Sequence, residues 1–306
     1  MSDEHDSGND SRAPDATWTD GALIRVRDLT RTYRQGDLEV RALRGVNLDV
    51  AREEFTALAG PSGSGKTTLL NIIGALDQPT AGSVEVDGTD ITGMEKGDAA
   101  DFRLDRVGFI FQAYNLVPVL TALENAEFTL LLRGVDARER RERVRPLLER
   151  VGLGDMMDRK PHELSGGQQQ RVAIVRALAT EPKIVLADEP TANLDSETSA
   201  DLLELMLELN RELGTTFLFS SHDPVVIHHA RRVVRLKDGR VDETERSGNG
   251  SGKGSPGETG GKTGREAAGE TARKTGREEA GETGGETGRG AHGDGSENSR
   301  ESGREG

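Results

Sequence analysis

The sequence of 306 residues contains no cysteine, few aromatic residues and no long apolar segment. The absence of cysteine excludes disulfide bridges and thiol catalysis. Because no run of about 18 or more apolar residues is present, we expect no membrane-spanning helix, and the acidic N-terminus is the opposite of a signal peptide. Acidic residues outnumber basic residues by 54 to 40, which argues against a dedicated nucleic-acid-binding protein.

Both ends of the chain lack the large apolar residues that a folded core needs. Residues 1–20 carry six acidic residues against one basic residue. Residues 247–306 have five alanines as their only apolar residues, and the segment at 262–271 recurs almost unchanged at 274–283. Such segments bury too little surface to offset the entropy of ordering, so both ends are predicted to be disordered. The remaining residues, about 21–246, have the size of one domain.

The segment from Gly60 to Thr68 fits the phosphate-binding pattern G-x-x-x-x-G-K-[ST] without a gap. It follows an apolar run at 55–59 and opens a helix-like run, which is the strand-loop-helix context that the pattern requires. Glycines let backbone N–H groups approach the phosphates, Lys66 can reach the β and γ phosphates, and the Thr67 hydroxyl can ligate magnesium. The predicted nucleotide-binding residues of this loop are Gly60, Pro61, Ser62, Gly63, Ser64, Gly65, Lys66, Thr67 and Thr68.

The region before this loop is predicted to be mostly β-structure. Alternating apolar and polar residues at 23–29 indicate a half-buried strand, and apolar runs at 38–43 and 46–50 indicate a hairpin pair. Tyr33 follows the first strand. A tyrosine in that position usually serves packing, but a flat ring roughly thirty residues before a phosphate loop can also stack on a purine base.

Two carboxylates end the apolar run at 184–187, and a histidine ends another apolar run further along the chain. Ligand sites in parallel sheets lie at the carboxyl ends of the strands. There, Asp188 can hold magnesium through water, and Glu189 is placed to polarise an attacking water. An isolated pair of this kind would more often cap a turn, but a phosphate loop in the same domain favours the catalytic interpretation. His222 can donate to a γ-phosphate.

A long insertion is predicted between the phosphate loop and these carboxylates. The separation of 122 residues between Lys66 and Asp188 far exceeds what a simple β-α-β-α-β unit needs. An apolar strand ends on the polar Gln112, and residues 121–149 show a helical pattern with one charged and one apolar face. We therefore expect an inserted helical subdomain over about residues 113–165.

A second helix start has the features of an anion-binding site. Ser165 can cap this helix, and Gly166 and Gly167 expose its first N–H groups. Since the loop at 60–67 already provides one triphosphate site, we interpret this second site as serving the nucleotide of a partner subunit.

These motifs resemble, in order, those of the ATP-binding subunit of an ABC transporter. The matching segments are the Walker A loop at 60–67, the Q-loop residue Gln112, the LSGGQ signature at 164–168, Walker B at 184–189, the D-loop at 192–195 and the H-loop residue His222. The resemblance covers about residues 22–243. It implies an α/β P-loop NTPase fold, with a RecA-like core, an N-terminal antiparallel β subdomain and an inserted α-helical signature subdomain.

The resemblance also implies roles for single residues, with ATP and Mg²⁺ as cofactors. Glu189, His222 and Lys66 are the implied catalytic residues. The implied metal ligands are Thr67, Gln112 and Asp188. Outside the Walker A loop, the implied nucleotide contacts are Tyr33, Gln112, Ser165, Gly166, Gly167 and Gln168.

A subunit of this family is expected to form a head-to-tail homodimer over two ATP molecules and to drive a separate permease at the cytoplasmic face of the cell membrane. Segments at 74–82, 122–125 and 186–195 are most similar to the lipoprotein-release, macrolide-export and cell-division branch, whose permeases have a large extracytoplasmic domain. Export or lipoprotein release is therefore expected, without a nucleic-acid partner. The alternative is a mechanotransmission ATPase, whose membrane partner controls an extracytoplasmic protein without translocating substrate.

Two short segments depart from the family's usual pattern. Residues 52–55 read Arg-Glu-Glu-Phe in place of a Gly-Glu turn, and residues 220–222 read Ser-Ser-His in place of Thr-His. Neither departure removes a catalytic group.

Overall fold

The computed structural model describes residues 21–36 and 38–246. The predicted disorder of residues 1–20 and 247–306 lies outside the described residues. Over the described ranges, the chain forms two β-sheets and eight α-helices, so the predicted α/β class is confirmed. None of these helices is long and apolar enough to cross a membrane.

A six-stranded sheet carries the phosphate loop. Its order is β10-β9-β3-β8-β7-β6, in which β9 to β6 are parallel and β10 is antiparallel. The strands are β3 (Phe55–Ala59), β6 (Val107–Ile110), β7 (Ile184–Asp188), β8 (Thr216–Ser221), β9 (Arg232–Lys237) and β10 (Arg240–Arg246). Strands β3, β7 and β8 are nearly continuous apolar runs because both of their faces are covered. Their carboxyl ends, where the sequence predicts the site, lie next to one another.

A second, antiparallel sheet has the order β2-β1-β4-β5. Its strands are β1 (Ala22–Gln35), β2 (Leu38–Ala51), β4 (Ala81–Val86) and β5 (Thr89–Asp90). The predicted hairpin of 38–43 with 46–50 is wrong, because both runs belong to β2, which pairs with β1 along its length. Tyr33 lies inside β1, opposite Val40, and does not follow the strand as predicted. Pairing with a long neighbour keeps β2 continuous through Gly45, which has φ +80°.

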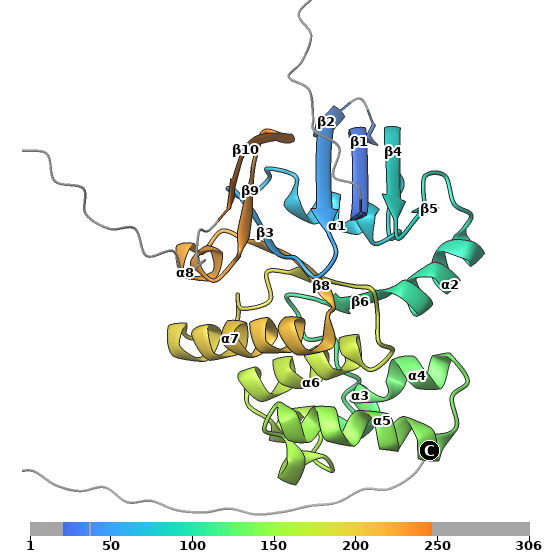
Figure 1. Ribbon diagram of the computed structural model, residues 1–306, viewed down its shortest axis with the longest axis vertical. Helices are drawn as coiled ribbons and strands as arrows, with labels where there is room; N and C mark the ends of the chain where they lie inside the picture. The colour runs from blue at the N-terminus through green and yellow to red at the C-terminus, as the bar shows by residue number, and fades with distance from the viewer. Residues whose placement is uncertain (1–20, 37, 247–306) are drawn as a thin grey trace, which may run out of the picture. The chain divides into compact units, whose positions relative to one another are not determined.

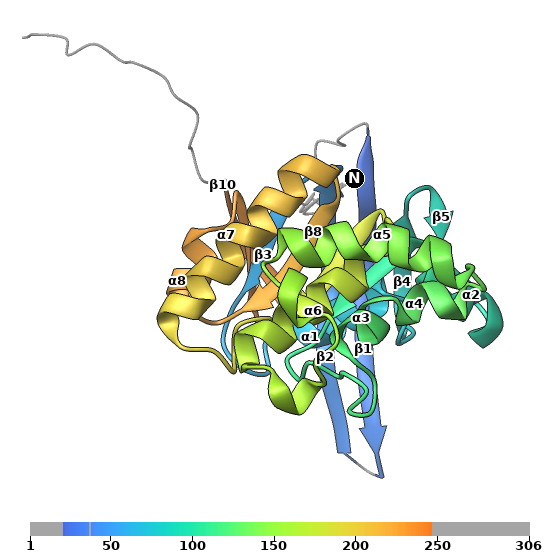
Figure 2. The same cartoon turned by 90° about the horizontal axis from the view of Figure 1, so that it is seen from below.

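The helices are α1 (Lys66–Ile73), α2 (Lys96–Arg106), α3 (Ala122–Ala126), α4 (Phe128–Leu132), α5 (Ala137–Arg150), α6 (Gly166–Leu178), α7 (Ser196–Leu213) and α8 (Pro224–His228), with 3₁₀ turns at Gly154–Met156 and Pro161–Glu163. The predicted helical stretch at 121–149 is thus divided into α3, α4 and α5. In Figure 1, α5, α6 and α7 lie on the opposite side of the six-stranded sheet from β1, β2 and β4, and Figure 2 shows these helices in front of the strands. The boundary of the inserted subdomain stays a prediction.

The six-stranded sheet separates two apolar cores. Side chains of successive strand residues point to opposite faces. Phe55, Phe217 and Phe219 therefore belong to the core shared with α3, α5, α6 and α7. Leu58 and Leu218 belong to the core shared with α1, α2 and the antiparallel sheet. Burial on both faces fixes the strand register, and with it the relative positions of the residues at the strand ends.

Asn125 on α3 holds the segment that follows Gln112. Its side chain is fully buried. Asn125 Oδ1 accepts a hydrogen bond from Val117 N at 2.7 Å, and Nδ2 contacts the carbonyl oxygens of Val117, Leu120 and Thr121 at 3.1, 3.1 and 2.9 Å. One buried amide therefore satisfies the backbone of a loop that has no ladder of its own.

We expect Asn125→Ala to lower the free energy of unfolding by about 2 kcal/mol, because it leaves buried backbone groups without partners. Urea denaturation measures this. Asn47→Ala is the matched control, since Asn47 is exposed and also makes two hydrogen bonds, both to Asp28. The control should lose about 0.5 kcal/mol or less. Equal losses in both variants would contradict a special role for Asn125.

Candidate active site

The loop between β3 and α1 packs tightly against β2. Gly65 has φ +104°, and a Cβ atom there would lie 2.7 Å from the carbonyl oxygen of Ala42, so a glycine is required. Lys66 begins α1 and is 7% exposed. Its Nζ donates hydrogen bonds to Gly60 O at 2.8 Å and Pro61 O at 3.1 Å. The ammonium group therefore lies inside the loop that the sequence predicts to bind phosphate.

Asp188, the last residue of β7, joins two neighbouring elements. Its Oδ1 accepts a hydrogen bond from Thr67 Oγ1 at 3.0 Å and another from Ser220 Oγ at 2.6 Å. Thr67 belongs to α1, and Ser220 belongs to β8. One carboxylate oxygen thus connects the helix of the phosphate loop to the ends of two adjacent parallel strands.

Glu189 is held by its backbone and by its carboxylate. It has φ +47°, in the left-handed region that few non-glycine residues adopt. Its N–H donates to Ser220 Oγ at 3.0 Å, and its Oε1 lies 2.9 Å from His222 Nδ1. The Glu189 side chain is 17% exposed, whereas that of His222 is 63% exposed. The pair therefore places a partly enclosed carboxylate beside an accessible imidazole.

Tyr33 has an exposed ring whose position is fixed by contacts with Asp77 and Arg31. Its hydroxyl donates to Asp77 Oδ2 at 2.7 Å. The Arg31 guanidinium lies 4.5 Å from the ring centroid and also forms an ion pair with Asp77 at 2.6 Å. The phenol and the cation thus share one carboxylate, which limits rotation of the ring.

Most of the predicted site residues line one open cavity of about 540 Å³. They are Tyr33, Ser62, Gly63, Gly65, Lys66, Thr67, Thr68, Gln112, Glu189 and His222. Gly60 and Pro61 line a neighbouring hollow that also includes His222. Ser64 belongs to the same loop but is only 3% exposed. Asp188 does not line the cavity, but it accepts a hydrogen bond from Thr67, which does.

The signature residues are not among those that line this cavity. Ser165 is exposed and caps α6. Its Oγ accepts from Gln168 N at 3.3 Å, and Gln168 Oε1 accepts from Ser165 N at 2.9 Å. The Gln168 side chain is therefore engaged in a capping box. A single chain brings together the predicted Walker A, Walker B, Q-loop and H-loop residues, but it does not bring Ser165, Gly166 or Gly167 to them.

Three residues with structural roles in the site were missed by the sequence analysis. Ser220 bridges Asp188 and Glu189, Asp77 holds Tyr33, and Asn193 Nδ2 donates to Gln112 O at 2.8 Å. The only available signal for Ser220 was a hydroxyl near the end of an apolar strand. No neighbouring residue indicates the role of Asp77, because its partner Tyr33 is 44 positions away in the sequence.

Comparison with known proteins identifies the family. The chain is 48% identical over 226 residues to an uncharacterized ABC transporter ATP-binding protein of Thermotoga maritima, and the match covers 74% of this chain and 96% of that protein. The family model described as ABC transporter matches residues 43–192. The chain belongs to the ABC transporter family.

Other ABC relatives differ in length. The chain is 44% identical to the uncharacterized ABC transporter ATP-binding protein MJ0796 of Methanocaldococcus jannaschii, covering 73% of this chain and 97% of that protein. It is 47% identical to the macrolide export ATP-binding/permease protein MacB of Syntrophobacter fumaroxidans, covering 72% of this chain. That match spans only 31% of the MacB chain, so this protein corresponds to about a third of such relatives.

Solved structures confirm the P-loop NTPase fold. A dimeric structure of a post-hydrolysis state of the ATP-binding cassette MJ0796, bound to ADP and Pi, matches with a TM-score of 0.68 and 43% identity. The match covers 73% of this chain and 98% of that chain. As a member of this family, the protein is an ATP-binding cassette that binds and hydrolyses ATP.

We expect Ser220→Ala to lower kcat for ATP hydrolysis by about tenfold with little change in KM, because misplaced catalytic groups slow the reaction more than they weaken binding. Steady-state phosphate release measures both constants. Ser221→Ala is the control, because Ser221 is equally buried and accepts from Asp223 N at 3.0 Å. If both variants lost kcat equally, Ser220 would have no special role in placing Asp188 and Glu189.

Proposed function

We propose that two copies of this chain close head to tail over two ATP molecules and that hydrolysis moves a separate membrane permease. The observation that carries this proposal is the separation of the nucleotide cavity from the signature segment within one chain. A second copy, turned by a two-fold rotation, supplies Ser165, Gly166 and Gly167 to the γ-phosphate side of the cavity. The dimer described for the ATP-binding cassette MJ0796 supports this arrangement.

In the proposed mechanism, the catalytic groups of one chain act together on the γ-phosphate. Glu189 accepts the proton of the attacking water, because Glu189 lines the cavity and Ser220 holds its backbone N–H in place. His222 is hydrogen-bonded to Glu189 Oε1 before ATP binds, and it donates the same N–H to the γ-phosphate afterwards. Lys66 exchanges its two loop carbonyl partners for phosphate oxygens. Tyr33 stacks on the adenine with the ring face that Arg31 does not cover.

The residues near Asp188 fit a magnesium ion. Thr67 Oγ1 and Asp188 Oδ1 lie 3.0 Å apart, and Gln112 lines the same cavity. These are hard oxygen donors, and Mg²⁺ commonly takes one or two protein ligands together with phosphate oxygens and water. When bound, the ion would neutralise charge that develops on the phosphates. Asp188 would then exchange its hydrogen bond from Thr67 for a direct or water-mediated contact with the metal.

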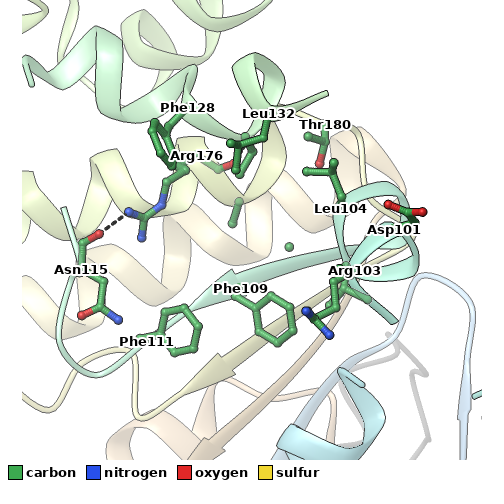
Figure 3. Close-up of a pocket in the computed structure, with 15 residues that line it drawn as sticks. Asp101, Arg103, Leu104, Phe109, Phe111, Asn115, Phe128, Leu132, Arg176 and Thr180 are labelled. Carbon is green, nitrogen blue, oxygen red and sulfur yellow. Dashed lines mark hydrogen bonds between the residues drawn. The ribbon is translucent and has the colours of Figure 1, made fainter. Parts of the chain in front are cut away.

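An apolar groove offers a surface for the permease. It has a volume of about 490 Å³ and lies between β6 and α2 on one side and α4 and α6 on the other. Figure 3 shows Phe109 and Phe111 on one wall and Phe128 and Leu132 on the other. Asn115, three residues after Gln112, also lines the groove. A permease segment bound here would contact the segment that follows Gln112. The motion of closure over ATP would then be transmitted to the permease through this surface.

The similarity to macrolide export ATP-binding/permease proteins supports an export or lipoprotein-release role for the complex. In this proposal, residues 21–246 form the ATP-binding domain, with its helical subdomain at about 113–165. The subunit lies at the cytoplasmic face of the membrane through its permease, which contributes the extracytoplasmic domain.

We expect Glu189→Gln to retain ATP binding, to hydrolyse ATP at least a thousandfold more slowly, and to accumulate dimers in ATP. The amide keeps the shape of the side chain but cannot take the proton from water. ATP binding by filter assay, phosphate release and size-exclusion chromatography measure the three effects. Lys66→Ala is the contrasting variant, which should lose ATP binding and dimers together. Normal turnover by Glu189→Gln, or a monomer in ATP, would overturn the proposed function.

A further inference from the structure

Arg176 on α6 forms a two-pronged contact with the Q-loop backbone. One terminal nitrogen donates to Asn115 O at 2.6 Å, and the other donates to Tyr114 O at 2.8 Å. Figure 3 shows the guanidinium directed from α6 toward Asn115 at the end of the groove. Burial lowers the pKa of Arg176, in keeping with a poorly solvated position. A planar guanidinium can bond two adjacent carbonyls at once, whereas a lysine cannot match that geometry.

Tyr114 reaches the same helix with its other end. A Cβ atom at Gly166 would lie 2.8 Å from the Tyr114 hydroxyl oxygen, so the ring tip rests against the first turn of α6. Arg176 lies ten residues further along α6, a rise of about 15 Å. Tyr114 therefore meets the signature helix near both of its ends, through a hydrogen bond of its carbonyl with Arg176 and through close packing of its ring tip on Gly166.

Two other anchors of this loop come from different elements. Asn193, from the segment before α7, binds Gln112 O, and Asn125, from α3, binds Val117. Arg176 and Gly166 thus connect α6, the helix that Ser165 caps, to Tyr114 and Asn115, the second and third residues after Gln112. We expect a shift of α6 along its axis to displace Tyr114, because its carbonyl is bonded to Arg176 and its ring tip packs on Gly166.

We propose that Arg176 is a positioning residue that links Gln112 in a chain's own ATP site to Ser165 in the site it completes for its partner. The proposal rests on the proposed function, since Ser165 meets a nucleotide only in the dimer. Hydrolysis at one site changes the surroundings of Gln112 in the nucleotide cavity, and the Tyr114–Arg176 contact carries that change to α6. The two ATP sites are thereby coupled within each chain as well as across the interface.

The test compares Arg176→Lys and Arg176→Met with Arg171→Lys in the full chain. Arg171 is a matched control because it lies on α6 and donates to a backbone carbonyl, Val151 O, at 2.8 Å, away from the Q-loop. Hydrogen exchange without nucleotide is measured for residues 113–117, followed by steady-state ATP hydrolysis. Thermal unfolding checks that each variant is folded.

We expect both Arg176 variants to exchange about tenfold faster at 113–117 than wild type, because loss of the clamp favours local opening. Their kcat should fall about tenfold with KM for ATP within about twofold, since the misplaced Gln112 affects the reaction more than nucleotide binding. Arg171→Lys should match wild type in all three quantities. Arg176→Lys keeps the charge, so it remains informative if Arg176→Met does not fold.

Exchange and kcat within twofold of wild type in Arg176→Lys would overturn the proposal. Equal losses in Arg171→Lys would also overturn it, because they would indicate a general defect of α6. A wild-type chain that does not hydrolyse ATP would instead refute the proposed function. The nucleotide-free exchange comparison would still decide whether Arg176 clamps the loop.

Discussion

The hydrogen bonds at Asp188 Oδ1 join the helix of the phosphate loop to the ends of two adjacent parallel strands. Thr67 reaches this oxygen from α1 and Ser220 reaches it from β8, while Glu189 N donates to the same Ser220 hydroxyl. Three segments far apart in the sequence therefore meet at the carboxyl end of one parallel strand. The apolar strands behind them set this meeting point, because burial on both faces of the sheet leaves the register no freedom to slip. The phosphate loop, Asp188 and Glu189 keep fixed relative positions as a result.

The signature helix α6 belongs to a different part of the mechanism. Its capped N-terminus at Ser165 lies outside the nucleotide cavity of its own chain, yet its side chains hold that chain's loops. Gln170 Nε2 donates to Pro190 O at 2.6 Å, next to Glu189, and Arg176 holds the Q-loop. The helix is therefore attached to the segments that follow Glu189 and Gln112. A displacement of α6 would therefore shift the backbone next to Glu189 and the backbone that follows Gln112.

Local sequence patterns were sufficient to predict the Walker A loop and the Ser165 cap, because each depends on a few neighbouring residues. Asp188 and Glu189 were predicted as site residues only together with the phosphate loop in the same domain. The supporting contacts were not predictable in this way. Ser220 meets Asp188 only because β8 pairs with β7, and Asp77 reaches Tyr33 across 44 positions. The continuous β2 was missed for the same reason, since its partner β1, rather than its own sequence, determines its length.

Complementation in mixed dimers tests the composite ATP site most directly. Ser165→Arg removes the signature contact and Lys66→Ala removes the phosphate contact, so neither variant alone can form an intact site. A one-to-one mixture should recover about a quarter of wild-type ATP hydrolysis, because half of the dimers are mixed and each contains one intact site of two. A mixture no more active than its separate components would contradict the account, since a site built within a single chain offers nothing to complement.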